Sequence, residues 1–331
     1  MIKNFLKSHS IHKDIVPFFD IIMILRLTLF FGVWSMVCIG MYIGSFINGE
    51  TQVNITDYNL FTIILFTGIS FICGSIFIIN QINDLESDTA NNKAIIIGQY
   101  ITKKTAVLVS NAICGIGFLL ICVVDYAVAF PVMIMYLVCG RLYSNETINA
   151  KSNLWMGLAF YLTLGYLLIL SGVVYNRYDS SIIYILVESL VYTIPFLLAY
   201  ISVALVINIL DSSGDRLVGR ETFVTSFGIR VTSILACFLC LVSFIIAIYL
   251  SDPLSSVSSL SAIPFFLFLV FRGKDKDILR SIRYPVLLLN FYVLTIYPLL
   301  FFPVISTYYI TKYYYWHRFS IHYPTLLVEN D

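Results

Sequence analysis

Long apolar stretches separated by short polar segments run along almost the whole chain. A helix needs about 20 mostly apolar residues to cross a bilayer. Nine stretches come close to or exceed this length: 17–47, 58–82, 105–124, 126–144, 153–174, 181–210, 228–250, 254–271 and 284–306. They are continuous rather than alternating in polarity, which favours helices over the strands of a membrane barrel. The pattern predicts an all-α, polytopic membrane protein with about nine transmembrane helices.

Basic residues lie almost entirely in alternate connecting segments. With nine spans, 16 of the 20 Lys and Arg residues fall on the same side as the N-terminus. The opposite side holds Arg177, Lys312 and Arg318, and Arg26 lies inside the first predicted span. Because segments rich in Lys and Arg stay in the cytoplasm, we expect the N-terminus and the segments that follow even-numbered spans to be cytoplasmic.

The composition supports a multi-pass integral membrane protein and excludes other classes. The chain is 59% hydrophobic and 12% charged, whereas a soluble domain carries about 25% charged residues. A net charge of +1 provides no basic face for nucleic acid. The four histidines lie in the terminal segments and the cysteines mostly inside apolar stretches, so neither residue type indicates a metal centre or a redox site.

A first acidic cluster stands at the end of the second span, where Asn80, Asp84 and Asp88 follow one another at intervals of four. If the helix continues, the three side chains share one face and form a surface of hard oxygen donors. Mg²⁺ usually combines one or two carboxylates with water and substrate phosphates, so the cluster points to a phosphate-bearing ligand. A solvated, charged helix end explains this cluster, taken alone, equally well.

A second cluster repeats the arrangement at the end of the sixth span. Asp211 and Asp215 are four residues apart, Asn208 precedes Asp211 by three, and Arg216 follows directly. Both clusters fall on the predicted cytoplasmic side. We therefore expect one transmembrane domain (1–331) with polar and aromatic termini (1–16 and 307–331) and two pseudo-repeated halves, roughly 17–150 and 151–306, around a central cavity. Acidic residues on both sides of a diphosphate can hold Mg²⁺, which neutralises the leaving group as its C–O bond breaks.

The two motifs resemble those of a known family. The first reads N-Q-x-x-D-x-x-x-D from Asn80, and the second reads D-x-x-G-D-R-x-x-G-R-x-T from Asp211. Together with the number of spans, they resemble the UbiA superfamily of intramembrane prenyltransferases, of which the chain is identified as a divergent member. The resemblance implies that Mg²⁺ and the diphosphate of a prenyl donor bind between the motifs. It also implies a set of metal-binding and catalytic positions: Asn80, Asp84, Asp88, Asp211 and Asp215.

Further residues match the family outside the acidic motifs. Tyr143-Ser144 with Lys151 resembles its Tyr-Ser and basic segment, and Arg26 resembles the Arg that opens its first helix. The resemblance thus implies that the substrate is bound by Arg26, Asn80, Lys93, Tyr143, Lys151, Asn208 and Arg216. Taken as residues alone, Arg26 could instead pair with Asp20 or reach the interface, and Lys151 could serve only orientation. The loop after Asp88 lacks the family's Arg-Pro and Ser, which indicates unusual substrates.

The expected function is Mg²⁺-dependent transfer of a prenyl group from a prenyl diphosphate to a membrane-soluble acceptor, either aromatic or lipid. A membrane terpene cyclase, as found in the same superfamily, would use the same ionisation without an acceptor. A cation transporter is an alternative from a different class. Transporters usually place ionisable groups near the bilayer midplane, whereas these acidic clusters stand at helix ends beside basic residues.

Overall fold

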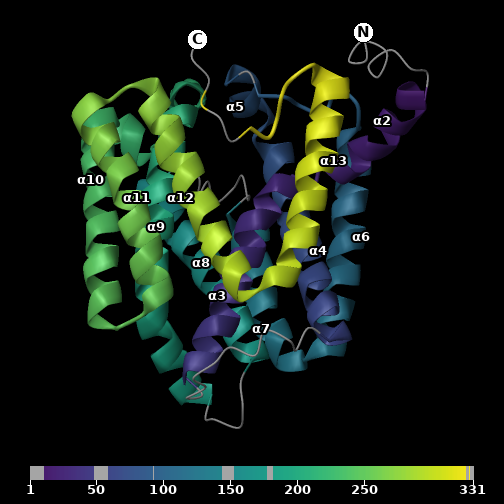
Figure 1. Cartoon of the computed structure of the whole chain (residues 1–331). Helices are drawn as coiled ribbons and strands as arrows, with labels where there is room; N and C mark the ends of the chain where they lie inside the picture. Colours follow the sequence, from purple (N-terminus) through teal and green to yellow (C-terminus); the bar gives the residue numbers. More distant parts are fainter. Residues whose placement is uncertain are drawn as a thin grey trace.

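The protein is a bundle of roughly aligned helices (Figure 1). The computed structural model describes residues 11–47, 59–91, 93–143, 153–176, 182–325 and 328. In chain order the elements are α2 (Ile11–Met23), η1 (Leu27–Leu29), α3 (Phe30–Ile47), α4 (Leu60–Asn83), α5 (Leu85–Ala90), α6 (Lys103–Val124), α7 (Tyr126–Met135), η2 (Tyr136–Leu142), α8 (Leu154–Tyr175), α9 (Ile182–Leu217), α10 (Phe223–Tyr249), α11 (Pro253–Arg272), α12 (Asp275–Ile296), η4 (Pro298–Leu300) and α13 (Phe301–Phe319).

Seven helical segments among the described residues are long and apolar enough to cross a bilayer, namely those of α3, α4, α6, α8, α9, α10 and α11. The predicted span 126–144 is the shorter apolar pair α7 and η2. Helix α12 has 22 residues, which corresponds to about 33 Å, but its first turns carry several charges. The prediction of an all-α, polytopic integral membrane protein is confirmed.

The last predicted span, 284–306, is wrong as a single helix. Helix α12 ends at Ile296, and Tyr297 leaves the helical region (φ −121°, ψ 72°) before Pro298. A residue before proline is disfavoured in the α conformation because the proline ring clashes with it. The chain then reverses, and α13 runs back along the bundle to the end where α5 lies (Figure 1). Arg318, expected on the opposite side, is therefore carried back to the side of the acidic motifs.

The first predicted span, 17–47, is also two helices rather than one. Arg26 has a left-handed backbone (φ 53°, ψ 58°) between α2 and η1, and a right-handed helix cannot run through such a residue. Helix α2 lies apart from α3 at the end of the bundle (Figure 1). The prediction that Arg26 lies inside a span is wrong, because this break places it at the end of the bundle.

Helices α2 and α13 are held together by polar contacts. Tyr314 Oη and Arg318 Nη2 both donate to the buried carboxylate of Asp20, each at 2.5 Å. Asp20 is therefore engaged by α13 and is not the partner of Arg26, which settles the alternative that the sequence left open.

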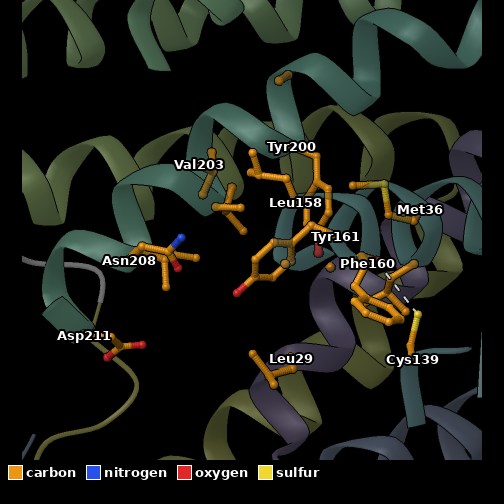
Figure 2. A pocket seen from close by; sticks show the side chains of 18 of the residues that line it. Leu29, Met36, Cys139, Leu158, Phe160, Tyr161, Tyr200, Val203, Asn208 and Asp211 are labelled. Carbon is orange, nitrogen blue, oxygen red and sulfur yellow. Dashed lines mark hydrogen bonds between the residues drawn. The ribbon is translucent and has the colours of Figure 1, made fainter. Parts of the chain in front are cut away.

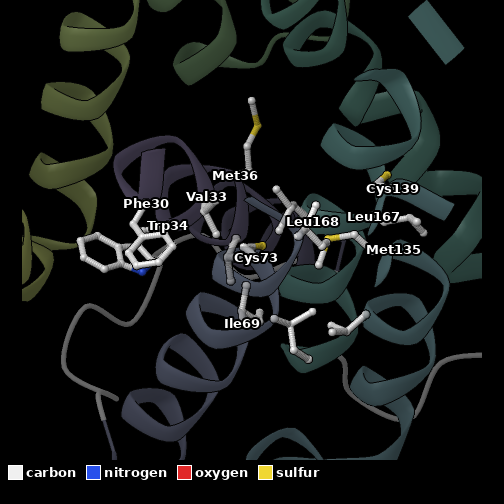
Figure 3. Packing of buried hydrophobic residues seen from close by; sticks show 14 of the residues in the cluster. Phe30, Val33, Trp34, Met36, Ile69, Cys73, Met135, Cys139, Leu167 and Leu168 are labelled. Carbon is white, nitrogen blue, oxygen red and sulfur yellow. The ribbon is translucent and has the colours of Figure 1, made fainter. Parts of the chain in front are cut away.

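Buried apolar side chains form two clusters. The larger one includes side chains of α3, α4, α7, η2 and α8 (Figure 3), and the smaller one joins α9, α10, α11 and α12. The α3–α8 crossing is close because of Gly172: a Cβ atom there would lie 2.8 Å from the backbone nitrogen of Met41. Small residues allow this kind of close helix contact in membrane proteins. Side chains of both clusters line the cavity described next.

Candidate active site

The first acidic motif lies where α4 passes into α5. Helical hydrogen bonding continues through the junction, since Asp84 N–H donates to Asn80 O (2.9 Å) and Asp88 N–H donates to Asp84 O (2.8 Å). The four-residue spacing therefore keeps Asn80, Asp84 and Asp88 on one face, and all three side chains line a common cavity. Asp84 and Asp88 are each 8% exposed, so both carboxylates face this cavity rather than the outer surface.

The second motif lies at the end of the long helix α9, where a glycine turn decides which arginine enters the site. Gly219 has a positive φ of 70°, Arg220 N–H donates to Asp215 O at 2.8 Å, and Gly219 N–H donates to Arg216 O at 3.3 Å. This pair of bonds is a Schellman motif, which ends a helix and turns the chain back over its last turn. The turn brings Arg220 over Asp215 and into the cavity.

Asn91 joins the two motifs directly. Its side-chain oxygen accepts from Gly214 N–H (2.9 Å) and from Ser213 Oγ (2.8 Å), and its side-chain nitrogen donates to Asp211 O (3.3 Å). A Cβ atom at Gly214 would lie 2.7 Å from Ser87 O, so glycine is required for α5 to approach α9 this closely. The sequence contained no local signal for this contact of Asn91.

Among the residues that the structure describes, three cations pair with the four carboxylates. Lys93 Nζ lies 3.0 Å from Asp88 Oδ1 and 2.8 Å from Asp211 Oδ1. Arg220 pairs with Asp84 through one nitrogen and lies 3.6 Å from Asp215 through the other. Arg26 Nη2 donates to Asp88 Oδ2 at 2.9 Å.

The bridging cations remain charged in this surrounding. Burial lowers the pKa of the Lys93 ammonium, but Asp211 and Asp88 raise it further, so the net pKa lies above its ordinary value. Burial likewise lowers the pKa of the Arg220 guanidinium while Asp84 and Asp215 raise it, again with a net increase. Charged side chains of both signs therefore form one end of the cavity, which we call its mouth: Arg26, Asp84, Asp88, Lys93, Asp211, Asp215 and Arg220.

The whole cavity has a volume of about 520 Å³, and behind the charged mouth its lining is mostly apolar. Asn208 and Asp211 lie on one side of the view in Figure 2, and Met36, Phe160 and Cys139 lie on the other. The Tyr161 hydroxyl points toward the polar side, and its ring meets that of Tyr200 edge-on at 6.5 Å. The cavity can thus hold an anionic group at its mouth and an apolar chain inside.

Most of the positions that the sequence singled out line this cavity: Arg26, Asn80, Asp84, Asp88, Lys93, Tyr143, Asn208, Asp211 and Asp215. Tyr143 follows the π-helical turn η2 and packs against Phe160 with ring centroids 4.7 Å apart. Lys151 lies outside the described residues, so its role stays a prediction.

Arg216 does not belong to this group. It is exposed on α9, because a residue one position after Asp215 points about 100° away around the helix. Arg220 takes the place expected of Arg216. The glycine before Arg220 was the sequence signal for the turn that brings it back, whereas Tyr161 and Tyr200 carried no signal beyond their aromatic character.

The donor set fits a hard divalent cation that is shared with a ligand. Within the part of the chain that the structure describes, no three His, Cys, Asp or Glu side chains gather closely enough to hold a metal ion by themselves. The mouth nevertheless presents carboxylates and amide oxygens, the donors that Mg²⁺ prefers, and Mg²⁺ commonly completes its coordination with phosphate oxygens and water. The residues present therefore fit Mg²⁺ bound together with a phosphate group.

Fold and site define a helical membrane protein whose cavity joins a charged mouth to an apolar interior. The chain belongs to the UbiA prenyltransferase family, which matches residues 33–291, and so to a family of prenyl-transferring enzymes. Arg26, α2 and α13 lie outside the matched residues. No curated protein sequence matches the chain significantly.

Solved structures share the fold at low sequence identity. A UbiA homologue from Archaeoglobus fulgidus bound to GPP and Mg²⁺ has a TM-score of 0.58 at 14% identity, covering 84% of this chain and 99% of its own. The same kind of homologue bound to DMAPP and Mg²⁺ has a TM-score of 0.55 at 15% identity, covering 82% and 98%. A structure of digeranylgeranylglyceryl phosphate synthase has 0.53 at 17% identity, covering 86% and 98%. These likenesses establish the fold.

Proposed function

We propose that the protein transfers a prenyl group from a prenyl diphosphate to a hydrophobic acceptor, an aromatic ring or a lipid, in a reaction that requires Mg²⁺. One observation carries the proposal: within the described part of the chain, four carboxylates from two distant motifs meet the cations Arg26, Lys93 and Arg220 at the mouth of an apolar cavity. The homologues bound to GPP or DMAPP with Mg²⁺ support a donor of this chemical class.

The charged mouth would bind the diphosphate. Arg26, Lys93 and Arg220 would donate hydrogen bonds to its oxygens, and such charge-assisted bonds are about twice as strong as neutral ones. The residues that would hold Mg²⁺ are Asn80, Asp84, Asp88, Asp211 and Asp215, with Asn208 beside them. When bound, Mg²⁺ supplies positive charge that neutralises the diphosphate as a leaving group.

The apolar interior would take the prenyl chain. Phe160, Tyr161 and Tyr200 line the cavity, where they would keep water from the reacting carbon. Their ring faces can also stabilise an allylic cation, as aromatic faces do for other cations. The acceptor then attacks this carbon, and the apolar surroundings suit an acceptor that dissolves in the membrane.

We further propose that the mouth faces the cytoplasm. The basic residues that start α6 and that connect α11 to α12, among them Lys103, Lys104 and Lys274, lie at the same end of the bundle as α5 (Figure 1). Positive residues favour the cytoplasmic side. A cysteine introduced at position 274 should react with a membrane-impermeant reagent only after intact cells are opened.

The test of the proposed function uses the full chain in lipid nanodiscs with Mg²⁺, prenyl diphosphates of several lengths and a panel of aromatic and lipid acceptors. Asp84→Asn and Asp211→Asn should each lower turnover by about 100-fold or more, as the loss of one electrostatic group commonly does. Glu86→Gln is the matched control: Glu86 is exposed between Asp84 and Asp88, and the variant should keep its activity.

Other outcomes would change the assignment. Full activity in either aspartate variant would refute the metal-binding role. A cyclised hydrocarbon or alcohol formed without any acceptor would favour a membrane terpene cyclase. Cation flux in proteoliposomes, without Mg²⁺-dependent consumption of a prenyl diphosphate, would favour a transporter.

A further inference from the structure

Lys93 and Arg220 each bridge one carboxylate of the first motif and one of the second. Lys93 links Asp88 to Asp211 at 3.0 and 2.8 Å. Arg220 links Asp84 to Asp215. Each bridge places a positive group between two carboxylates that stand far apart in the sequence, which is also where a divalent cation shared by the motifs would have to enter.

A divalent cation alone would meet a poor site in this arrangement. The carboxylates are already paired with Lys93, Arg220 and Arg26. An entering cation would have to displace these positive groups, which repel it at short range. A diphosphate alone would be repelled by the carboxylates of both motifs, which include Asp88, Asp211 and Asp215. Either ligand is disfavoured without the other.

When the metal ion and the diphosphate bind together, each offsets the repulsion that the other would meet alone. A diphosphate offers oxygens to the Lys93 ammonium and the Arg220 guanidinium, whose planar fork suits phosphate. When Lys93 and Arg220 pair with the diphosphate, the carboxylates that they bridge can turn to the metal ions. The side chains that could move this way are accessible, since Lys93 is 38% and Arg220 is 19% exposed.

We propose that Lys93 and Arg220 act as internal counter-ions that keep divalent metal out of the site until a diphosphate binds and takes them over. This inference rests on the proposed function, because it concerns the same site and the same ligands. It has a thermodynamic consequence, since coupling between two ligands is reciprocal: the metal must strengthen diphosphate binding by the same factor as the diphosphate strengthens metal binding.

The experiment measures metal binding rather than turnover. The full chain in nanodiscs is dialysed to equilibrium against Mn²⁺, used in place of Mg²⁺, with and without a prenyl S-thiolodiphosphate, whose C–S bond resists ionisation. Protein-bound Mn²⁺ is corrected for Mn²⁺ bound by the analogue in solution. The analogue should raise the affinity of the wild-type chain for Mn²⁺ by about tenfold or more, within the usual range of coupling.

Variants separate this coupling from an ordinary loss of ligand binding. Lys93→Met removes the charge and keeps an apolar stem, so it should bind Mn²⁺ alone about fivefold or more tightly than the wild type, with a smaller effect of the analogue. Lys93→Arg keeps the charge and should retain the weak binding of Mn²⁺ alone. Lys104→Met, an equal loss of charge at an exposed position on α6, should behave as the wild type. If Lys93→Met does not fold, Arg220→Met tests the same expectation at the second bridge.

The possible results distinguish this inference from the proposed function. Equal Mn²⁺ affinity with and without the analogue in the wild type, or no gain of Mn²⁺ affinity in a folded Lys93→Met or Arg220→Met chain, overturns the counter-ion role while leaving the metal site intact. A chain that binds no Mn²⁺ even with the analogue overturns the proposed function itself.

Discussion

Arg220 and Arg216 provide a matched pair for testing whether the geometry of the mouth governs donor binding. They are the same residue type, four positions apart at the end of α9, but only Arg220 reaches the cavity, where it pairs with Asp84 and Asp215. Replacing each by Met removes the guanidinium and keeps much of the apolar stem. Any difference between the two variants then reports on position rather than on net charge.

The structure sets the size of the expected difference. A hydrogen bond to a charged group contributes about 1.5–3 kcal/mol, and every 1.4 kcal/mol is a factor of ten. If Arg220 makes one such bond to the diphosphate, Arg220→Met should lower kcat/KM for the prenyl diphosphate by about 10- to 150-fold. Arg216→Met should change it by less than about twofold, as exposed substitutions rarely contribute more than 0.5 kcal/mol.

The assay is steady-state turnover in nanodiscs at fixed Mg²⁺ and acceptor, with thermal unfolding measured on the same preparations. Thermal unfolding is measured because Arg220→Met removes the ion pairs of Arg220 with Asp84 and Asp215. Arg220→Lys keeps the charge but loses the planar fork, so its kcat/KM should fall between those of the wild type and Arg220→Met. Equal losses for Arg216→Met and Arg220→Met would refute the reasoning, as would a loss in Arg220→Met explained entirely by unfolded protein.

Two further predictions concern the packing that holds the site. Gly214→Ala should push α5 away from α9 and lower turnover by about tenfold or more, because small displacements at an active site are costly. Gly115→Ala is the control and should keep turnover, because a Cβ atom there meets nothing within 4 Å. Equal turnover in the two variants would contradict the close approach of α5 to α9. Asp20→Ala should remove the carboxylate that pairs with Arg318 and lower the free energy of unfolding by about 3 kcal/mol, seen as a lower Tm. The exposed Asp14→Ala is its control, and an unchanged Tm for Asp20→Ala would show that the α2–α13 contact contributes little.

The helices were largely predictable, but two of their ends were not. Continuous apolar length is a local property, so it identified the spans. The breaks at Arg26 and before Pro298 lie inside apolar stretches, where composition does not change. The proline did carry a signal for the second break, since the residue before it resists helical geometry, but hydrophobicity alone extended the span across it. The direction of α13 then depends on the residues that it packs against, which include Asp20 of α2.

One part of the candidate site was likewise predictable from the sequence and another part was not. The interval of four between Asn80, Asp84 and Asp88, and between Asp211 and Asp215, placed these side chains on one face of each helix, because the helical repeat is a property of the backbone. The choice between Arg216 and Arg220 needed the turn at Gly219, in which the chain folds back on itself. The contact of Asn91 with the second motif could not be predicted, because its partners lie on another helix.

The sequence by itself determined that the chain is a helical membrane protein and that each acidic motif presents its oxygens on one helix face. Both follow from local patterns, the length of apolar runs and the period of the helix. Only the tertiary structure decided which charges meet: Arg26 with Asp88 rather than Asp20, Lys93 between Asp88 and Asp211, and Arg220 between Asp84 and Asp215. Lys93–Asp88 and Arg220–Asp215 are contacts within one helix end, but Arg26–Asp88, Lys93–Asp211 and Arg220–Asp84 join segments far apart in the sequence. Their formation depends on how the helices pack, which no local pattern encodes.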